Sequence, residues 1–117
     1  MKYLCLICAE KVMEQMSKAD VDKHYEEYRE LTADIRKSGH FVDCYRLLPP
    51  SAAITIRVRK GKISSTDGPF IETKEQLGGF LLLDVPDLND AIRIASQFPA
   101  ARIGSVEVRP MKEQGCA

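Results

Sequence analysis

A turn-rich stretch at residues 66–80 constrains this chain more than any other feature. An Asp-Gly-Pro triplet stands near its start, several carboxylates follow, and a glycine pair at 78–79 leads into the apolar run 79–85. Glycine adopts backbone angles that other residues avoid and proline fixes φ, so the triplet must turn. The apolar run predicts a central strand, and the glycine pair lets another backbone or a ligand come close. A surface turn therefore leads directly into the middle of a sheet.

Length and charge limit the classes of protein to which the chain can belong. Its 117 residues provide room for one hydrophobic core of ordinary size, so we predict a single domain over 1–117. Lys and Arg number 17, as do Asp and Glu, and the net charge is zero. A general nucleic-acid binder needs a basic excess, so the balanced charge argues against this class and leaves only local basic patches open. The apolar run at 1–8 is too short to span a membrane and lacks a signal-peptide cleavage site, so we expect a cytoplasmic protein.

Cys5 and Cys8 have the spacing of redox and zinc-binding pairs. We interpret them as buried apolar residues, because they lie in a predicted strand, where side chains three apart point to opposite faces. No second pair of Cys or His lies near them in the sequence to complete a tetrahedral zinc site. We therefore predict reduced thiols, and neither a metal nor a cofactor.

Two helices are predicted from their end signals and apolar spacing. Ser17 followed by Asp20 resembles a capping box, and Gly39 predicts the C-terminal end of that helix. Asp87 is the predicted N-cap of the second helix, and Pro99 stops it. The expected apolar faces consist of Val21, Tyr25, Tyr28, Leu31 and Ile35 in the first helix, and of Leu88, Ala91, Ile92 and Ala95 in the second.

The remaining segments predict strands joined mostly antiparallel. Strands are expected at 2–8, 40–48, 53–59, 62–66, 79–85 and 103–109, with a hairpin turn at 60–61 and a helical turn at 72–76. This order predicts an α+β domain, a ferredoxin-like βαββαβ fold with an extra hairpin strand. Both helices then cover one sheet face. Alternation places Thr55, Arg57, Ser105, Glu107 and Arg109 on the other face, which a second copy would enclose as a cleft.

Several motifs resemble one protein family. DGPF at 67–70, ETKEQLGGF at 72–80, PAARIGSVEVRP at 99–110 and the opening MKYLCLI are similar to those of the DGPF, or YCII-related, proteins. The resemblance covers nearly the whole chain. It implies a dimeric α/β barrel of ferredoxin-like subunits, and it implies little about chemistry. It also implies a regulatory connection, because proteins that resemble this one are often encoded beside extracytoplasmic-function sigma factors.

One branch of the wider YCII group uses a His–Asp pair, and one member removes chloride from a chlorinated hydroxyquinol. The resemblance implies that His24 stands in the place of that histidine, on the first helix. The aspartate of the family pattern belongs to an Asp-Pro pair after the second helix, where this chain has Phe98-Pro99. Without that carboxylate, nothing in the sequence orients or charges the imidazole. Because Lys23 and Glu26 flank it closely, the other interpretation of His24 is a solvent-exposed residue.

The candidate catalytic groups are Asp67, Glu72 and His24. Asp67 can act as a base at the mouth of the cleft, or cap its own turn through its side chain. Glu72 and Glu75 share a face if the segment is helical, and such a pair can divide into acid and base or bind a hard cation. The alternative for both is a solvated turn beside Lys74.

The candidate ligand-binding residues are Arg57, Phe70, Glu107 and Arg109. Glu107 and Arg109 share a strand face and would bind an anionic or polar ligand, or else form a salt bridge to a neighbouring strand or subunit. The same two interpretations apply to Arg57 and Arg46.

Three functions are compatible with these features. The first is a homodimer that binds a small molecule in the cleft and acts as a lyase or isomerase through carboxylate proton transfer. The second is an accessory protein linked to an extracytoplasmic-function sigma factor, without catalysis and without DNA contact of its own. The third is a structural domain in which the motifs serve folding and dimerisation alone.

Overall fold

The computed structural model of the chain describes residues 1–10, 16–71 and 73–113. The elements follow in the order β1 (Lys2–Glu10), α1 (Lys18–Ser38), β2 (Phe41–Arg46), the 3-10 helix η2 (Pro50–Ala52), β3 (Ile54–Arg59), β4 (Lys62–Asp67), β5 (Glu75–Asp84), α2 (Leu88–Ala95), α3 (Ala100–Ile103) and β6 (Gly104–Pro110). No helix among these described residues is long and apolar enough to cross a membrane.

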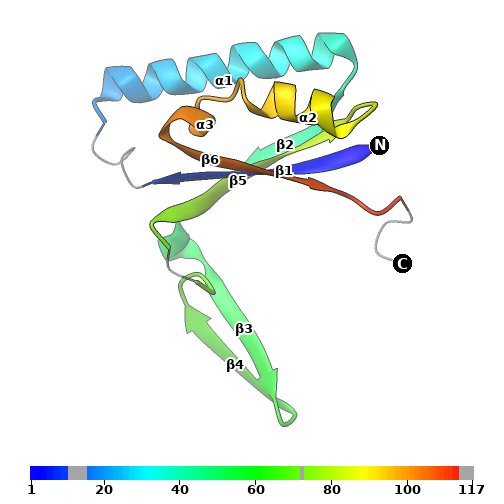
Figure 1. Cartoon of the computed structure of the whole chain (residues 1–117). Coiled ribbons are helices and arrows are strands. Elements are labelled where there is room, and N and C mark those ends of the chain that lie inside the picture. The colour runs from blue at the N-terminus through cyan, green and yellow to red at the C-terminus, as the bar shows by residue number, and fades with distance from the viewer. Residues whose placement is uncertain (11–15, 72, 114–117) are drawn as a thin grey trace.

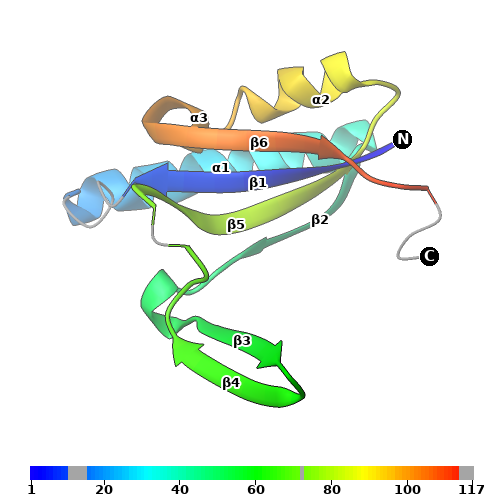
Figure 2. The same cartoon turned by 60° about the horizontal axis from the view of Figure 1, so that its bottom comes forward.

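An antiparallel sheet of order β2-β5-β1-β6 forms the body of the molecule. The helices α1, α2 and α3 lie on one face of this sheet, and none of the described α-helices covers the opposite face (Figures 1 and 2). The predicted α+β, ferredoxin-like fold is therefore confirmed. β5 lies between β2 and β1, which confirms the expectation that the apolar run after the glycine pair is a central strand.

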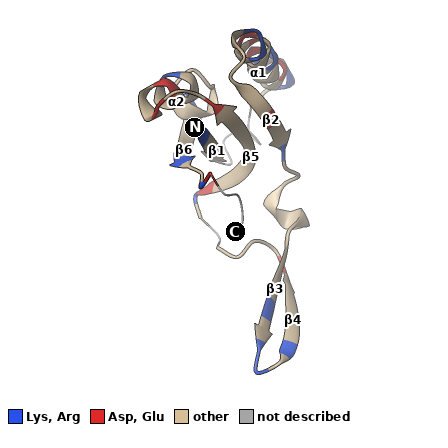
Figure 3. Ribbon diagram, turned by 90° about the vertical axis from the view of Figure 1, so that its right-hand side faces the viewer, with Lys and Arg blue, Asp and Glu red and all other residues tan. Residues whose placement is uncertain are grey.

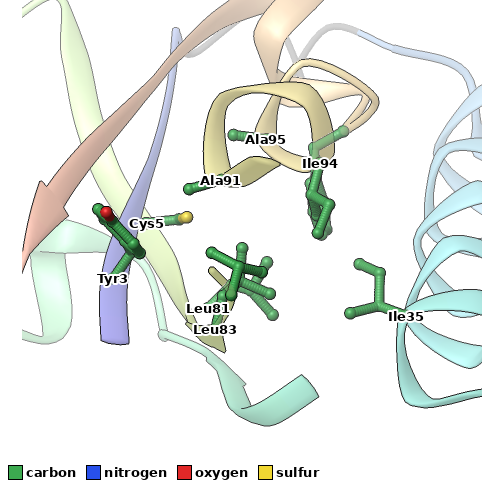
Figure 4. Close-up of a cluster of buried hydrophobic side chains, with 10 residues drawn as sticks. Tyr3, Cys5, Ile35, Leu81, Leu83, Ala91, Ile94 and Ala95 are labelled. Carbon is green, nitrogen blue, oxygen red and sulfur yellow. The ribbon is translucent and has the colours of Figure 1, made fainter. Parts of the chain in front are cut away.

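The core fills the space between the sheet and the helices. Cys5 and Leu83 enter it from the strands, and Ile94 enters from α2 (Figure 4). Ile35 from α1 and Phe98 from the segment after α2 belong to the same cluster. Burial of a large apolar side chain contributes about 1.5–3 kcal/mol, so this cluster holds the helices on the sheet.

Three of the four predicted helix ends are confirmed, whereas α2 already ends at Ala95, before the predicted stop at Pro99. Ser17 Oγ accepts from the backbone N–H of Asp20 at 3.2 Å, and Gly39 ends α1 in the left-handed conformation with φ of 81°. Asp87 Oδ1 accepts from the backbone N–H of Asp90 at 3.0 Å. These caps satisfy backbone groups that the helix itself leaves unpaired.

The apolar face predicted for α2 was partly wrong. Leu88 and Ile92 are 46% and 49% exposed, whereas Ile94 is buried together with Ala91 and Ala95. Positions 91, 94 and 95 form an i, i+3, i+4 stripe, and the packing of the short helix turns this stripe toward the sheet. After Pro99 the chain forms the short helix α3, which was not predicted.

The hairpin of β3 and β4 does not extend the main sheet. It forms a two-stranded sheet of its own, with a turn in which Lys60 and Gly61 have φ of 53° and 75°. It projects away from the body of the molecule (Figures 1 and 3). Ile54, Ile56 and Val58 are 64%, 59% and 56% exposed, so the alternation correctly predicts a strand but not a covered face.

The expected helical turn at 72–76 was also wrong. Glu75 already begins β5, where it lies opposite Glu10, and Lys74 lies in a bend. Pairing with β1 fixes the extended conformation there, and this long-range pairing outweighs the local helical preference. Glu72 lies outside the described residues.

Candidate functional site

A pocket of about 620 Å³ opens between α1 and the sheet. The side of α1 that carries His24, Tyr25 and Tyr28 forms one wall, β2 forms another, and residues 78–81 of β5 form the floor. Its volume lies within the ~300–1,000 Å³ that is usual for small-molecule sites. The pocket therefore occupies the helix-covered side of the sheet, whereas the sequence predicts a cleft on the bare side.

The glycine pair of β5 shapes the floor. A Cβ atom on Gly79 would stand 2.8 Å from the carbonyl oxygen of Tyr45, so the neighbouring strand β2 approaches too closely for a side chain at this position. A Cβ atom on Gly78 would meet only the carbonyl oxygen of Ile7, at 3.8 Å. The predicted close backbone approach is thus found at Gly79.

His24 is buried in the wall of the pocket, with 9% of its surface exposed. The solvent-exposed interpretation was wrong, because His24 lies one turn before Tyr28 on the stripe that leads to Ile35 in the core. Its ring centroid is 5.3 Å from that of Tyr25 and 5.0 Å from that of Tyr28.

The surroundings of His24 favour its neutral form. Burial lowers the pKa of the imidazole, Glu27 opposes this effect, and the positive charges of Arg102 and Arg46 lower the pKa further. The Glu27 carboxylate is itself paired with Arg102 at 2.7 Å. A neutral imidazole has one nitrogen able to accept a proton, so His24 is suited to act as a base near neutral pH.

Phe98 closes the inner end of the pocket at the position where the family pattern has an aspartate. Its ring centroid is 5.3 Å from that of Tyr28, which in turn contacts His24. Burial raises the pKa of Tyr28 to about 12, so this phenol keeps its proton. The structure thus brings position 98 into the pocket that His24 lines, but supplies an aromatic ring there in place of a carboxylate.

Asp67 lies at the exposed end of β4, outside the pocket. The turn that follows is held by backbone, since the N–H of Gly68 donates to the carbonyl oxygen of Ala53 at 2.7 Å. Thr55 Oγ1 adds a hydrogen bond to the carbonyl oxygen of Gly68 at 2.9 Å. Among the described residues, the Asp67 carboxylate has no hydrogen-bond partner, so the structure gives no sign of a cap formed by this side chain.

The predicted ligand-binding residues form two separate pairs. The guanidinium carbon of Arg57 lies 5.8 Å from the ring centroid of the exposed Phe70, and Arg109 forms a salt bridge with Glu107 on β6. The first pair belongs to the hairpin and its following loop, and the second to the main sheet. Neither pair lines the pocket, and the ligand role of these four residues stays a prediction.

The described cysteines, Cys5, Cys8 and Cys44, lie on strands of the main sheet. Cys5 is in the core, and its burial raises the pKa of the thiol to about 11. Cys8 and Cys44 are partly buried free thiols, and burial raises their pKa values as well. Within residues 1–10, 16–71 and 73–113, no cluster of three His, Cys, Asp or Glu side chains could hold a metal ion.

Sequence reasoning missed most of the pocket. The sequence interpretation of Tyr25 and Tyr28 is packing, and it leaves Arg46 out of the candidate site, although all three residues line the pocket. A usable signal was present, since His24, Tyr25 and Tyr28 follow one another at helical spacing on the face that turns toward the sheet.

Comparison with known proteins agrees with the sequence motifs. The family model of the YCII-related domain matches residues 1–114. An uncharacterized protein of Rhizobium meliloti (strain 1021) is 43% identical over 88 residues, which is 71% of this chain and 71% of that protein. The chain therefore belongs to the YCII-related domain family.

Proposed function

We propose that the protein binds a small organic molecule in the pocket between α1 and the sheet. The observation that carries this proposal is a cavity of about 620 Å³ in which aromatic rings surround a buried imidazole. Apolar walls with a few convergent polar groups are typical of small-molecule sites.

The chemistry that fits this pocket is proton transfer of a lyase or isomerase type. No Asp or Glu side chain lines the pocket within the described residues, so the base inside it is His24. A carboxylate mechanism through Asp67 would need a ligand that also reaches the end of β4. His24 has the advantage that burial keeps its imidazole uncharged and ready to accept a proton.

A fragment screen by ligand-detected NMR tests the pocket. Ala33→Trp places an indole on α1 where Ala33 lines the cavity, and this variant should lose the hits of the wild type. Ala19→Trp, at an exposed position of the same helix, should keep them. Hits that survive in Ala33→Trp, or an absence of hits in the wild type, would count against the proposal.

The bare face of the sheet supports the expected homodimer. Leu4 and Leu6 of β1 and Phe80 and Leu82 of β5 alternate with core residues and are only partly covered. A second copy placed face to face would cover them. Light scattering should give twice the chain mass, and Leu6→Glu should reduce it to one chain mass. A monomer in the wild type would reject this arrangement.

A second candidate function is supported by the hairpin. β3 and β4 expose Ile54, Ile56 and Ile63, and basic residues gather toward the tip of the hairpin (Figure 3). An apolar stripe with a basic border fits a protein contact, and the sigma-factor link implied by the resemblance names the partner to try. If a sigma factor is encoded beside this protein, the purified factor should bind the wild type and not Ile63→Ser. Equal binding of both would exclude the hairpin as the contact.

A further inference from the structure

We infer that the ligand of the pocket is a planar organic anion, whose carboxylate is held by Arg46 while its ring lies against the tyrosines of α1. The inference rests on the proposed function of the pocket and names the class of ligand that it takes. Three independent features of the described lining support it: its charge, the state of its arginines and its aromatic walls.

The charged side chains in the described lining of the pocket are all basic. Arg29, Arg36 and Arg46 line it, and no carboxylate does so within the described residues. The buried imidazole of His24 adds a donor or acceptor but no compensating negative charge. A site with several guanidinium groups and no acidic partner favours a ligand that supplies the negative charge itself.

Arg46 is held in place without being neutralised. Its guanidinium carbon lies 4.0 Å from the centroid of the Tyr25 ring, and no described carboxylate forms a salt bridge with it. By contrast, Arg93, Arg102 and Arg109 are each paired with an acidic side chain. Stacking occupies the face of a guanidinium and leaves its N–H edge available, and that edge matches a carboxylate with two parallel hydrogen bonds.

Arg36 repeats this arrangement farther along α1. Its guanidinium carbon lies 4.2 Å from the centroid of the Phe41 ring, again without a described carboxylate partner. Arg46 is the better anchor because its stacking partner, Tyr25, lines the pocket itself. Arg36 then adds long-range attraction for the same anion.

The inner walls favour a flat ligand. Tyr25 and Tyr28 stand one turn apart on α1, with their ring centroids 6.5 Å apart, and Phe98 meets Tyr28 at the inner end. Aromatic rings prefer offset or edge contacts with other rings, so a conjugated ligand gains more here than a flexible chain of the same size. A volume of about 620 Å³ is large enough for a fused two-ring system.

Three probes of one shape and different charge test the inference on the wild-type protein. Naphthoate, naphthamide and naphthylmethylammonium are titrated while backbone amide NMR signals are followed. Naphthoate should shift signals of α1 and β2 and bind at least about tenfold more tightly than the amide, since a charged hydrogen-bonded pair contributes about 1.5–3 kcal/mol. The ammonium probe should bind most weakly.

Variants of Arg46 then assign the anchor. Arg46→Gln should remove most of the preference for naphthoate over naphthamide, and Arg46→Lys should keep more of it, because lysine keeps the charge and loses the planar fork. Arg59→Gln, at an exposed position of the hairpin, is the matched control and should change nothing. Thermal unfolding of each variant verifies that it is folded.

The outcomes distinguish a failure of the anionic-ligand inference from a failure of the proposed pocket function. If all three probes bind the pocket equally well, the pocket remains a small-molecule site and the inference of an anionic ligand is wrong. If the preference for naphthoate persists in Arg46→Gln, the anion is held elsewhere and the role of Arg46 is wrong. If no probe shifts α1 or β2 signals, the inference and the proposed pocket function fall together.

Discussion

The burial of a residue in this protein, and the side chain that fits at its position, depend on the segments that pack against it. Gly78 and Gly79 are adjacent in the sequence, yet only Gly79 faces a backbone atom close enough to exclude a side chain. His24 follows a lysine and precedes charged residues within its helix, yet it is buried. In both cases the segment that packs against the residue comes from a distant part of the chain. For Gly79 it is β2, and for His24 it is the sheet together with the residues that pack on it.

The glycine pair gives a matched test. Gly79→Ala should lower the free energy of unfolding by about 1–3 kcal/mol, because the new methyl group would force β2 away from β5. Gly78→Ala should be tolerated, since its Cβ atom would have ordinary contact distance to the Ile7 carbonyl oxygen. Urea unfolding measures both. Equal losses in the two variants would show that the close approach of β2 does not control this position.

Protonation of His24 should couple stability to pH. Burial lowers its pKa in the folded protein below the usual value of about 6.5, so the unfolded chain binds the proton more readily. The stabilisation is complete above pH 6.5 and is lost as the pH falls through 6.5 toward the folded pKa. The slope from this group is at most about 1.4 kcal/mol per pH unit.

Urea unfolding at a series of pH values between 7.5 and 5 (a range chosen to bracket the usual pKa of about 6.5) checks this coupling. The wild type should lose stability more steeply on acidification than His24→Gln, which cannot titrate. Parallel curves for the two proteins would mean that His24 is not buried in its neutral form.

At the scale of secondary-structure elements, the ends were easier to predict than the faces. Ser17, Gly39 and Asp87 are local signals, because a cap is formed by residues close in sequence, and the structure confirms all three. The buried face of α2 and the extended start of β5 depend on partners far away in the chain, and these predictions failed.

The N-cap of α2 is the sharpest test at this scale. α2 is a short helix, Leu88–Ala95, which is marginal on its own and depends on its cap and its core contacts. Asp87→Ala should therefore lower the free energy of unfolding by about 1 kcal/mol. Asp87→Asn keeps a side-chain oxygen that can accept the bond from the Asp90 N–H and is the control. If both variants match the wild type in denaturant unfolding, the cap is not needed.

The whole molecule is extended by its hairpin. The Cα radius of gyration is 16.2 Å, whereas a compact chain of this length would have about 13.4 Å. The projection of β3 and β4 away from the body accounts for the difference (Figure 1). An exposed apolar stripe on an arm of this kind is typical of surfaces that contact another protein, in line with the contact proposed above.

Substitutions at two isoleucines, Ile94 in the core and Ile56 on the β3–β4 hairpin, compare the contributions of the core and of the hairpin to stability. Ile94→Ala should cost about 2–5 kcal/mol at every protein concentration, because Ile94 is buried among core residues. Ile56→Thr should stay within about 0.5 kcal/mol of the wild type in dilute solution, because Ile56 is exposed on the hairpin. A loss from Ile56→Thr that is independent of concentration would mean that the arm is packed within one chain.

The sequence alone determined the main helices and strands, their order, the α+β class and the family. These follow from local features of the sequence: helix caps, prolines and glycines that end an element, the spacing of apolar residues, and motifs of consecutive residues. Only the tertiary structure decided which faces of the elements are covered, and therefore where the proposed site lies. Whether His24 is buried, whether Arg46 meets a carboxylate or a tyrosine, and whether Ile56 lies inside or outside depends on contacts between segments far apart in the chain. Periodicity shows that an element has two different faces, and packing decides which of them meets a ligand, a partner or water.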